Sequence, residues 1–291
     1  MNTTEGIALF LTALRGVKSP ATVEWYENRL VELSKAFGAC PVDSITTDDL
    51  RAWRSTQSQR AISAWTLHGN VRAAKRFFKW LVEEGHLQSS GAARLELPHL
   101  PMDPAPGIAK SDMQKMIRAA ADNLRDYALC KFLADSAARV GGLVSLRIEN
   151  LDFETGRATV REKGSKSRTV YFSRSTGLAL LRYLGGRKHG PVFLDVRQRG
   201  EPLTVSGVYQ LLQRLARRCG VEHKFNPHAW RHGVARRWLQ ERGANLGVVS
   251  QLLGHADVGV TVKFYGTFAD EDLRRAHQKY TIVSDDDDAG A

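Results

Sequence analysis

Two histidines, an arginine and a tyrosine lie in the last quarter of the chain, at spacings that could bring them to one site. The segment NPHAWRHGVARRW, residues 226–238, contains His228 and Arg231. LLGH ends at His255, and FYG places Tyr265 ten residues later. A phenol becomes a nucleophile once its proton is removed, and an imidazole can accept that proton. A guanidinium is always charged and binds phosphate oxygens in a bidentate way. These residue types suit transfer chemistry at a phosphate.

A metal site is the main alternative for this segment, because His228 and His232 are four residues apart. The zinc-protease pattern needs a glutamate directly after the first histidine, and Ala229 stands there. No third ligand is evident, so we expect neither a metal nor another cofactor. A single His-x-x-Arg pattern by itself favours a purely structural role, and other residues must decide.

Composition favours a polyanionic partner. The chain has 291 residues, of which 43% are hydrophobic, enough for two domains with real cores. Its formal net charge is +11, and the clear acidic run is Asp285–Asp288 at the end. Nucleic acid is the commonest partner of such a basic protein, although a basic surface without a ligand is also possible.

Cysteine usage and hydropathy indicate a cytoplasmic protein. Cys40, Cys130 and Cys219 are far apart, odd in number and without a CxxC pair, which argues against a disulfide framework or a zinc site. The N-terminal apolar segment lacks a leading positive charge and is typical of a helix rather than a signal peptide. No segment approaches the roughly 20 apolar residues of a membrane span, so no membrane partner is expected.

A proline-rich segment, residues 98–107, contains four prolines and a glycine and is predicted to be a linker. We expect a helical domain over 1–97, a second domain over 108–280 and an acidic tail over 281–291. Thr155-Gly156 and Gly164-Ser165 mark turns, and RATVRE and RTVYFS are rich in strand formers. The predicted fold is mainly α with a small antiparallel β-sheet in the C-terminal domain.

Two predicted helices carry candidate binding residues. Asn226 and Pro227 are a cap and a first-turn residue, so a helix should run to about Glu241. A helix over about 65–84 has one apolar face and one basic face without an acid. The basic face is predicted to bind phosphate, the alternative being a solvated surface; its residues are Arg72, Lys75, Arg76 and Lys79.

Two more cations complete the pattern. Arg139 stands near a helix end in SAARVGGLVSL, and Lys163 stands at a predicted hairpin tip in REKGSKSR. The order Arg, Lys, His-x-x-Arg, His, Tyr over about 130 residues resembles the tyrosine recombinases, the family of phage integrases and Xer-type resolvases. The N-terminal half, from SPATVEWYENRL to RAAKRFFKWLVEEGHL, resembles their helical (SAM-like) core DNA-binding domain. The resemblance implies a two-domain clamp around duplex DNA.

The resemblance also implies roles in covalent catalysis. Tyr265 would attack a DNA phosphate and form a 3′-phosphotyrosine with a free 5′-hydroxyl. His228 would be the general base toward Tyr265, and Lys163 the general acid for the leaving 5′-oxygen. Because the covalent intermediate stores the bond energy, rejoining would need no ATP.

The remaining family positions are implied to bind or order the phosphate. Arg139 and Arg231 would hold its non-bridging oxygens, and His255 would support it. Lys166 and Arg168, on the same hairpin as the catalytic lysine, are expected to contact DNA.

Two departures from the family pattern stand out. The family has Glu or Asp three residues after its first arginine, and this chain has Gly142. Support for the site would then be missing or come from elsewhere. The family also places its tyrosine nine residues after the LGH histidine, where this chain has Phe264. We expect a one-residue insertion to accommodate Tyr265.

The implied function is site-specific DNA recombination, in phage or mobile-element integration and excision, without an arm-binding domain. Double-stranded DNA with specific target sites would be the partner. The protein would be a homo-tetramer on DNA and a monomer or weak oligomer when free. The alternatives are a DNA-binding repressor or accessory factor that has lost cleavage, and a type IB topoisomerase. The compact helical first domain argues against the topoisomerase.

Overall fold

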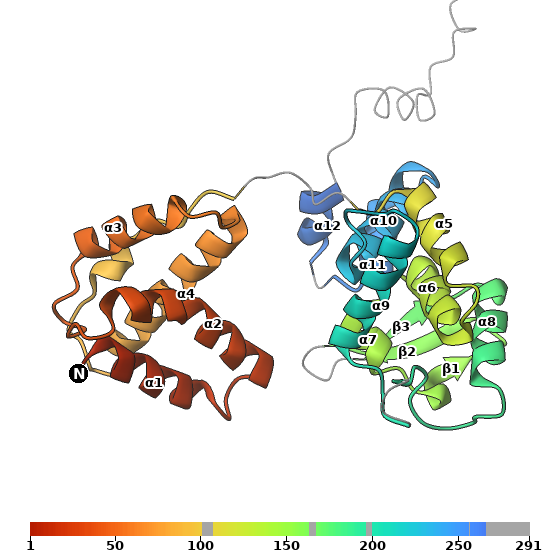
Figure 1. Cartoon of the computed structure of the whole chain (residues 1–291), viewed down its shortest axis with the longest axis horizontal. Helices are drawn as coiled ribbons and strands as arrows, with labels where there is room; N and C mark the ends of the chain where they lie inside the picture. The colour runs from red at the N-terminus through yellow and green to blue at the C-terminus, as the bar shows by residue number, and fades with distance from the viewer. Residues whose placement is uncertain (101–106, 163–166, 196–199, 256, 266–291) are drawn as a thin grey trace, which may run out of the picture. The chain divides into compact units, whose positions relative to one another are not determined.

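The computed structural model describes residues 1–100, 107–162, 167–195, 200–255 and 257–265, without the side chains of Lys263 and Phe264. The chain divides into two compact units, Met1–Met102 and Asp103–Ala291, each with its own apolar core. The division falls inside the proline-rich segment 98–107. Figure 1 shows the helices of both units and the small sheet of the second.

The first unit is helical. Its core is built from side chains such as Phe10, Leu30, Phe77 and Leu81, all fully buried. The elements are α1 (Thr3–Leu14), α2 (Pro20–Phe37), α3 (Thr47–Ser58), α4 (Ala64–Glu83) and a 3₁₀ turn, η1 (Gly91–Arg94).

Helix α4 confirms the predicted helix over 65–84. The Ser63 hydroxyl accepts a hydrogen bond from the Thr66 amide at 3.1 Å and caps its first turn. Val71, Ala74 and Phe78 are buried on its apolar face. Gly85 follows the helix with φ +74°, a conformation that favours glycine.

The second unit packs helices around a small sheet. Its fully buried large side chains include Trp230, Phe132 and Phe193. The helices are α5 (Lys110–Ala119), α6 (Leu124–Ser136), α7 (Val140–Val144), η2 (Ile148–Asn150), α8 (Arg174–Leu184), α9 (Val205–Arg218), α10 (Pro227–Gln240), α11 (Leu246–Leu253) and α12 (Val258–Tyr265).

The sheet has three antiparallel strands in the order β1 (Leu151–Asp152), β2 (Arg157–Arg161) and β3 (Ser167–Tyr171). Val160 of β2 is paired with Arg168 of β3, which fixes which residues reach the same end of the hairpin. A mainly helical fold with one small antiparallel sheet is confirmed. The predicted hairpin tip, with Lys163 and Lys166, lies outside the described residues.

Three further points concern the whole chain. All three cysteines are free. Among the described residues, no helix is both long enough and apolar enough to cross a membrane. The acidic run Asp285–Asp288 lies beyond the described residues.

Candidate active site

Helix α10 supplies the buried arginine of the site. The Asn226 side chain accepts a hydrogen bond from the Ala229 amide at 2.9 Å, and Pro227 fills the first helical position, as predicted. One turn on, Arg231 is only 4% exposed. Its Nη1 donates to the Ala137 carbonyl at 2.7 Å and its Nη2 to the Leu253 carbonyl at 2.5 Å. The guanidinium is therefore fixed in place before any ligand binds.

Three arginines meet at the C-terminal end of α11. Besides Arg231, Arg168 donates to the Leu252 carbonyl at 2.5 Å and Arg139 to the Gly254 carbonyl at 3.2 Å. The last carbonyls of a helix lack partners within the helix and carry a partial negative charge. The end of α11 thus gathers three positive charges that would otherwise repel one another.

Gly254 is required at this turn. It has φ +64°, and a Cβ atom there would lie 2.2 Å from Arg168 Cδ. A side chain at this position would therefore displace Arg168. The glycine ends α11 and leads directly into His255.

A single carboxylate lies among these cations. Glu162, at the end of β2, contacts Arg139 Nη1 and accepts from Arg168 Nε at 3.0 Å. Burial, together with the charges of Arg139 and Arg168, lowers the pKa of Arg231 to about 9. Arg231 is still charged at neutral pH.

His255 is held as a neutral imidazole. Its Nδ1 lies 2.7 Å from the hydroxyl of Thr261, a fully buried residue of α12. Burial, with the neighbouring arginines, lowers the pKa of His255 to about 4. This contact connects the α11 end to the helix that carries Tyr265.

Tyr265 is next to His232 rather than His228. The Tyr265 hydroxyl lies 2.5 Å from His232 Nδ1. Burial raises the pKa of Tyr265 to about 12, against the opposing effect of Arg231, and lowers the pKa of His232 to about 4. The proton therefore stays on the phenol, and the neutral imidazole lies within reach to accept it.

A pocket of about 570 Å³ lies beside the arginine cluster. His228 lies at its wall. Its side chain is still reached by solvent, but partial desolvation by the surrounding protein, with the charges of Arg231 and Arg139, lowers its pKa. Such a pocket can hold an anion against fixed cations. Its other lining residues include Arg139, Gly142, Arg161, Glu162, Tyr209 and Arg231.

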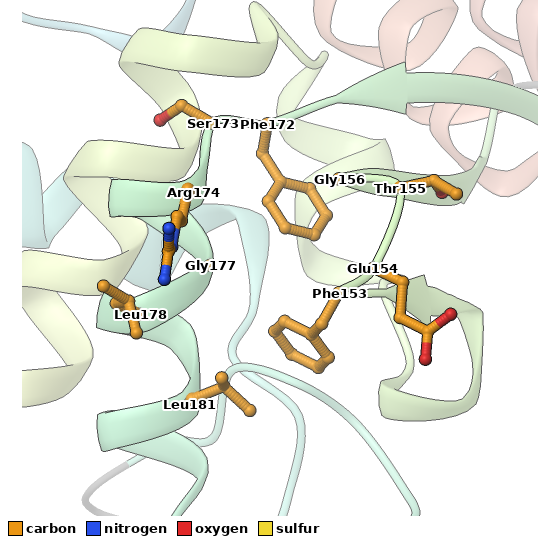
Figure 2. A pocket seen from close by; sticks show the side chains of 10 residues that line it. All are labelled: Phe153, Glu154, Thr155, Gly156, Phe172, Ser173, Arg174, Gly177, Leu178 and Leu181. Atoms are coloured by element: carbon orange, nitrogen blue, oxygen red, sulfur yellow. The ribbon is translucent and has the colours of Figure 1, made fainter.

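A second pocket, of about 510 Å³, lies between the loop after β1 and helix α8. Figure 2 shows the rings of Phe153 and Phe172 beside Leu178 and Leu181, with Arg174 as its one arginine. It contains none of the predicted site residues and no cluster of cations. The chemistry points to the first pocket.

The structure brings together five of the six predicted catalytic residues and Arg168, and it adds several that the sequence analysis did not assign. Lys163 and Lys166 lie outside the described residues. The gathered residues are Arg139, Arg168, His228, Arg231, His255 and Tyr265. The additional residues are Arg161, Glu162, Tyr209 and His232. His232 was considered only as a metal ligand, although its position next to Arg231 and one turn from His228 was a usable signal.

The basic face of α4 differs from its prediction. The face is not free of acids, because Glu83 lies one turn beyond Lys79 and forms ion pairs with Arg76 at 2.8 Å and Lys79 at 3.6 Å. The Lys75 ammonium donates to the Ala93 carbonyl at 3.1 Å and also to the Leu95 carbonyl. Glu83 is the last residue of α4, so it follows the row of four cations and still reaches two of them.

Arg72 remains on this face, with its guanidinium 4.8 Å from the centre of the Trp25 ring. All four cations line a pocket of about 780 Å³. Within the described part of the chain, no group of three or more His, Cys, Asp or Glu side chains is arranged as a metal site.

Comparisons with known proteins agree with this geometry. Residues 107–271 match the phage integrase family, and residues 7–85 match the phage integrase N-terminal SAM-like domain. Tyrosine recombinase XerC of Xylella fastidiosa (strain M23) is 32% identical over 268 residues, 88% of this chain and 89% of that protein. XerC of Alcanivorax borkumensis is 28% identical over 272 residues, 89% and 88% of the two chains.

Solved structures share the fold. The Tn1549 transposon integrase in complex with a circular intermediate DNA aligns with a TM-score of 0.76 at 19% identity, covering 97% of this chain and 100% of that one. A lambda integrase dimer bound to a core site aligns with a TM-score of 0.74 at 16% identity, covering 89% and 97%. With a family match over more than half of its length and a sequence relative spanning most of it, the chain belongs to the phage integrase family and is a tyrosine recombinase.

Proposed function

We propose that this protein cuts and rejoins duplex DNA at specific sites, with Tyr265 forming a 3′-phosphotyrosine. The observation that carries the proposal is the contact of the Tyr265 hydroxyl with neutral His232, on the helix that also holds Arg231. In this proposal, the nucleophile Tyr265 lies on α12, and its proton acceptor His232 and the fixed cation Arg231 lie on α10. Relatives named XerC and the DNA-bound integrase structures support DNA as the partner.

In the proposed reaction, the scissile phosphate occupies the pocket beside Arg139 and Arg231. The two guanidiniums hold its non-bridging oxygens, where charge accumulates in the transition state. Because both are held by backbone carbonyls, little reorganisation opposes the reaction. His228, at the pocket wall, adds a ring N–H that can donate to the same phosphate.

Tyr265 Oη then attacks phosphorus, its proton passes to His232 Nδ1, and the bond from phosphorus to the 5′-oxygen breaks. Lys163 protonates that oxygen, giving a free 5′-hydroxyl and a 3′-phosphotyrosine. This assigns to His232 the general-base role that the sequence alone suggested for His228. Attack by a 5′-hydroxyl on the phosphotyrosine reverses the steps and restores the phenol.

His255 has a positioning role in this scheme. Its bond to Thr261 connects the arginine-bound end of α11 to α12. The turn that holds the arginines therefore also holds α12, the helix that carries Tyr265.

The basic face of α4 and the cations of the β2–β3 hairpin are proposed to contact the DNA backbone. Phosphate contacts of this kind give affinity and register but no sequence information. On DNA, we propose a homo-tetramer that joins two sites, in the integration and excision of phage or other mobile DNA.

A covalent-capture experiment tests the proposal. A random duplex library, nicked near its centre so that the cleaved strand loses its short 5′-hydroxyl fragment, is incubated with the protein. We expect wild-type protein to form a covalent adduct with a selectable sequence, and Tyr265→Phe to bind the same DNA without forming one. Sequence-specific binding without any adduct would identify a DNA-binding protein. Relaxation of arbitrary supercoiled plasmid without recombination would identify a topoisomerase.

A further inference from the structure

We propose that Glu162 is a positioning residue that holds Arg139 toward the phosphate, in place of a carboxylate at position 142. The inference rests on the proposed function, because Arg139 is there a phosphate ligand. Glu162 would supply the support that Gly142 cannot. It lies directly after strand β2, whereas Gly142 lies in helix α7.

The geometry of Glu162 fits this role. Its side chain is 14% exposed and its two oxygens engage different arginines. Oε2 contacts Arg139 Nη1, whereas Oε1 lies 3.0 Å from Arg168 Nε and 2.9 Å from Arg168 Nη2. Arg168 is itself anchored to the Leu252 carbonyl at 2.5 Å. The carboxylate therefore connects Arg139 to a cation that is fixed to the helix end.

A side chain at position 142 would be in tight contact with Val160, so a carboxylate fits poorly there. Gly142 is buried in α7, and a Cβ atom there would lie 3.1 Å from Val160 Cβ and 3.4 Å from Val160 Cγ2. A longer acidic side chain would be pressed against a fully buried valine. The glycine lets α7 approach β2 closely, and this approach brings Arg139, at the start of α7, to Glu162 at the end of β2.

Arg139 needs a side chain that fixes its position more than Arg168 and Arg231 do. Its side chain is 36% exposed, whereas that of Arg168 is 13% exposed and Arg231 is 4% exposed overall. It lines the pocket and must remain open to a ligand. A guanidinium has five N–H donors, and the contacts to Glu162 and the Gly254 carbonyl leave others for phosphate oxygens.

An alternative interpretation of the same contact is that the Glu162 carboxylate takes the place of a DNA phosphate at Arg139 and so competes with DNA binding. The two interpretations predict opposite effects of neutralising Glu162 on the cleavage rate. A positioning residue makes cleavage slower when it is neutralised, and a competing anion makes cleavage faster. Glu162→Gln, which keeps size and removes charge, therefore separates them.

The experiment uses the full chain and the duplex selected by wild-type covalent capture. We expect Glu162→Gln to slow single-turnover adduct formation about 10- to 100-fold, as for a misplaced catalytic group. The dissociation constant for the same duplex should change less than about threefold, because most phosphate contacts lie elsewhere. Glu149→Gln, which removes a carboxylate paired with Arg147 at 3.1 Å, is the matched control and should leave the rate unchanged.

A coupling measurement excludes a merely structural role. The Arg139→Lys variant lacks the guanidinium that Glu162 holds. Adding Glu162→Gln to that variant should therefore slow covalent capture less than about twofold further. Thermal melting of each variant shows whether it is folded. An equal loss in both backgrounds, accompanied by a lowered Tm, would overturn the proposal in favour of general stabilisation.

The remaining outcomes separate this inference from the function on which it rests. If wild-type protein captures no duplex, the proposed function fails. If wild-type protein is captured and Glu162→Gln reacts as fast or faster, the positioning role alone is overturned.

Discussion

The two units of this protein use arginine and lysine in contrasting ways. In the second unit, Arg231 is buried and its guanidinium is bonded to backbone carbonyls. On α4 of the first unit, Arg72 and Lys79 are exposed, and Lys79 shares Glu83 with a neighbouring arginine. The first arrangement fixes charge at one point at the cost of desolvation, and the second leaves charge hydrated along a surface.

This contrast indicates which cations can serve catalysis and which serve affinity. Stabilising a transition state requires donors that are already in place, whereas holding a DNA backbone requires positive charge that can adjust. Each of the following predictions tests that division, beginning with the largest expected effect.

Arg231→Ala should slow covalent capture at least about 1,000-fold, because it removes the fixed guanidinium that we propose holds the phosphate. It should also destabilise the second unit by about 3 kcal/mol, since two buried carbonyls lose their donor. Single-turnover kinetics and urea unfolding measure the two effects. Arg218→Ala, which removes an exposed arginine paired with Asp122 at 2.5 Å, is the matched control and should do neither. Equal losses in both variants would contradict the special role of the fixed guanidinium.

His232→Gln should slow covalent capture about 100- to 1,000-fold, because the Tyr265 proton then lacks its acceptor. His228→Gln, at the pocket wall, should slow it about 10-fold. Raising the pH toward 9 should partly restore His232→Gln, since hydroxide takes over the role of the base. If instead the His228 variant is the slower one and is restored by base, the proton acceptor is His228.

Stability should fall as the pH falls from about 6.5 to about 4. His232 and His255 have folded pKa values of about 4, below the ordinary value of 6.5, so the unfolded chain binds more protons in this window. Because solvent reaches both rings, the combined loss should be about 2 kcal/mol. Urea unfolding at several pH values should show a flatter profile for the double variant His232→Gln/His255→Gln. An unchanged slope would contradict neutral burial of these imidazoles.

Single substitutions on α4 should have the smallest effects. Lys79→Gln and Arg72→Gln should each weaken DNA binding about two- to fivefold and lower the salt slope by about one. Lys75→Gln should mainly lower the Tm, because its ammonium holds the Ala93 and Leu95 carbonyls. Fluorescence anisotropy at several salt concentrations measures the slopes. A cleavage defect at saturating DNA in any of these variants would contradict the assignment of catalysis to the second unit and of DNA affinity to α4.

Sequence periodicity and capping residues were enough for the architecture. Asn226 and Pro227 stand at the start of α10, as the capping pattern predicted, and strand formers between turn residues predicted the hairpin. These features depend on neighbours in the chain, so they can be inferred without tertiary information.

The site was only partly predictable. The resemblance to the tyrosine recombinases implied that Arg139, Arg231, His255 and Tyr265 belong to one cluster. The partner of Tyr265 could not be predicted, because His228 and His232 lie one helical turn apart and only packing decides which ring faces α12. Glu162 was missed for a related reason, since its importance depends on the close approach of α7 and β2.

The end of α11 works as a template for the cationic cluster. It spaces three like charges through the carbonyls of Leu252, Leu253 and Gly254, and every residue type has a carbonyl. Other apolar residues could therefore replace Leu252 and Leu253 without altering the geometry of the cluster. Gly254 cannot, because the spacing that α11 imposes leaves no volume for a side chain beside Arg168.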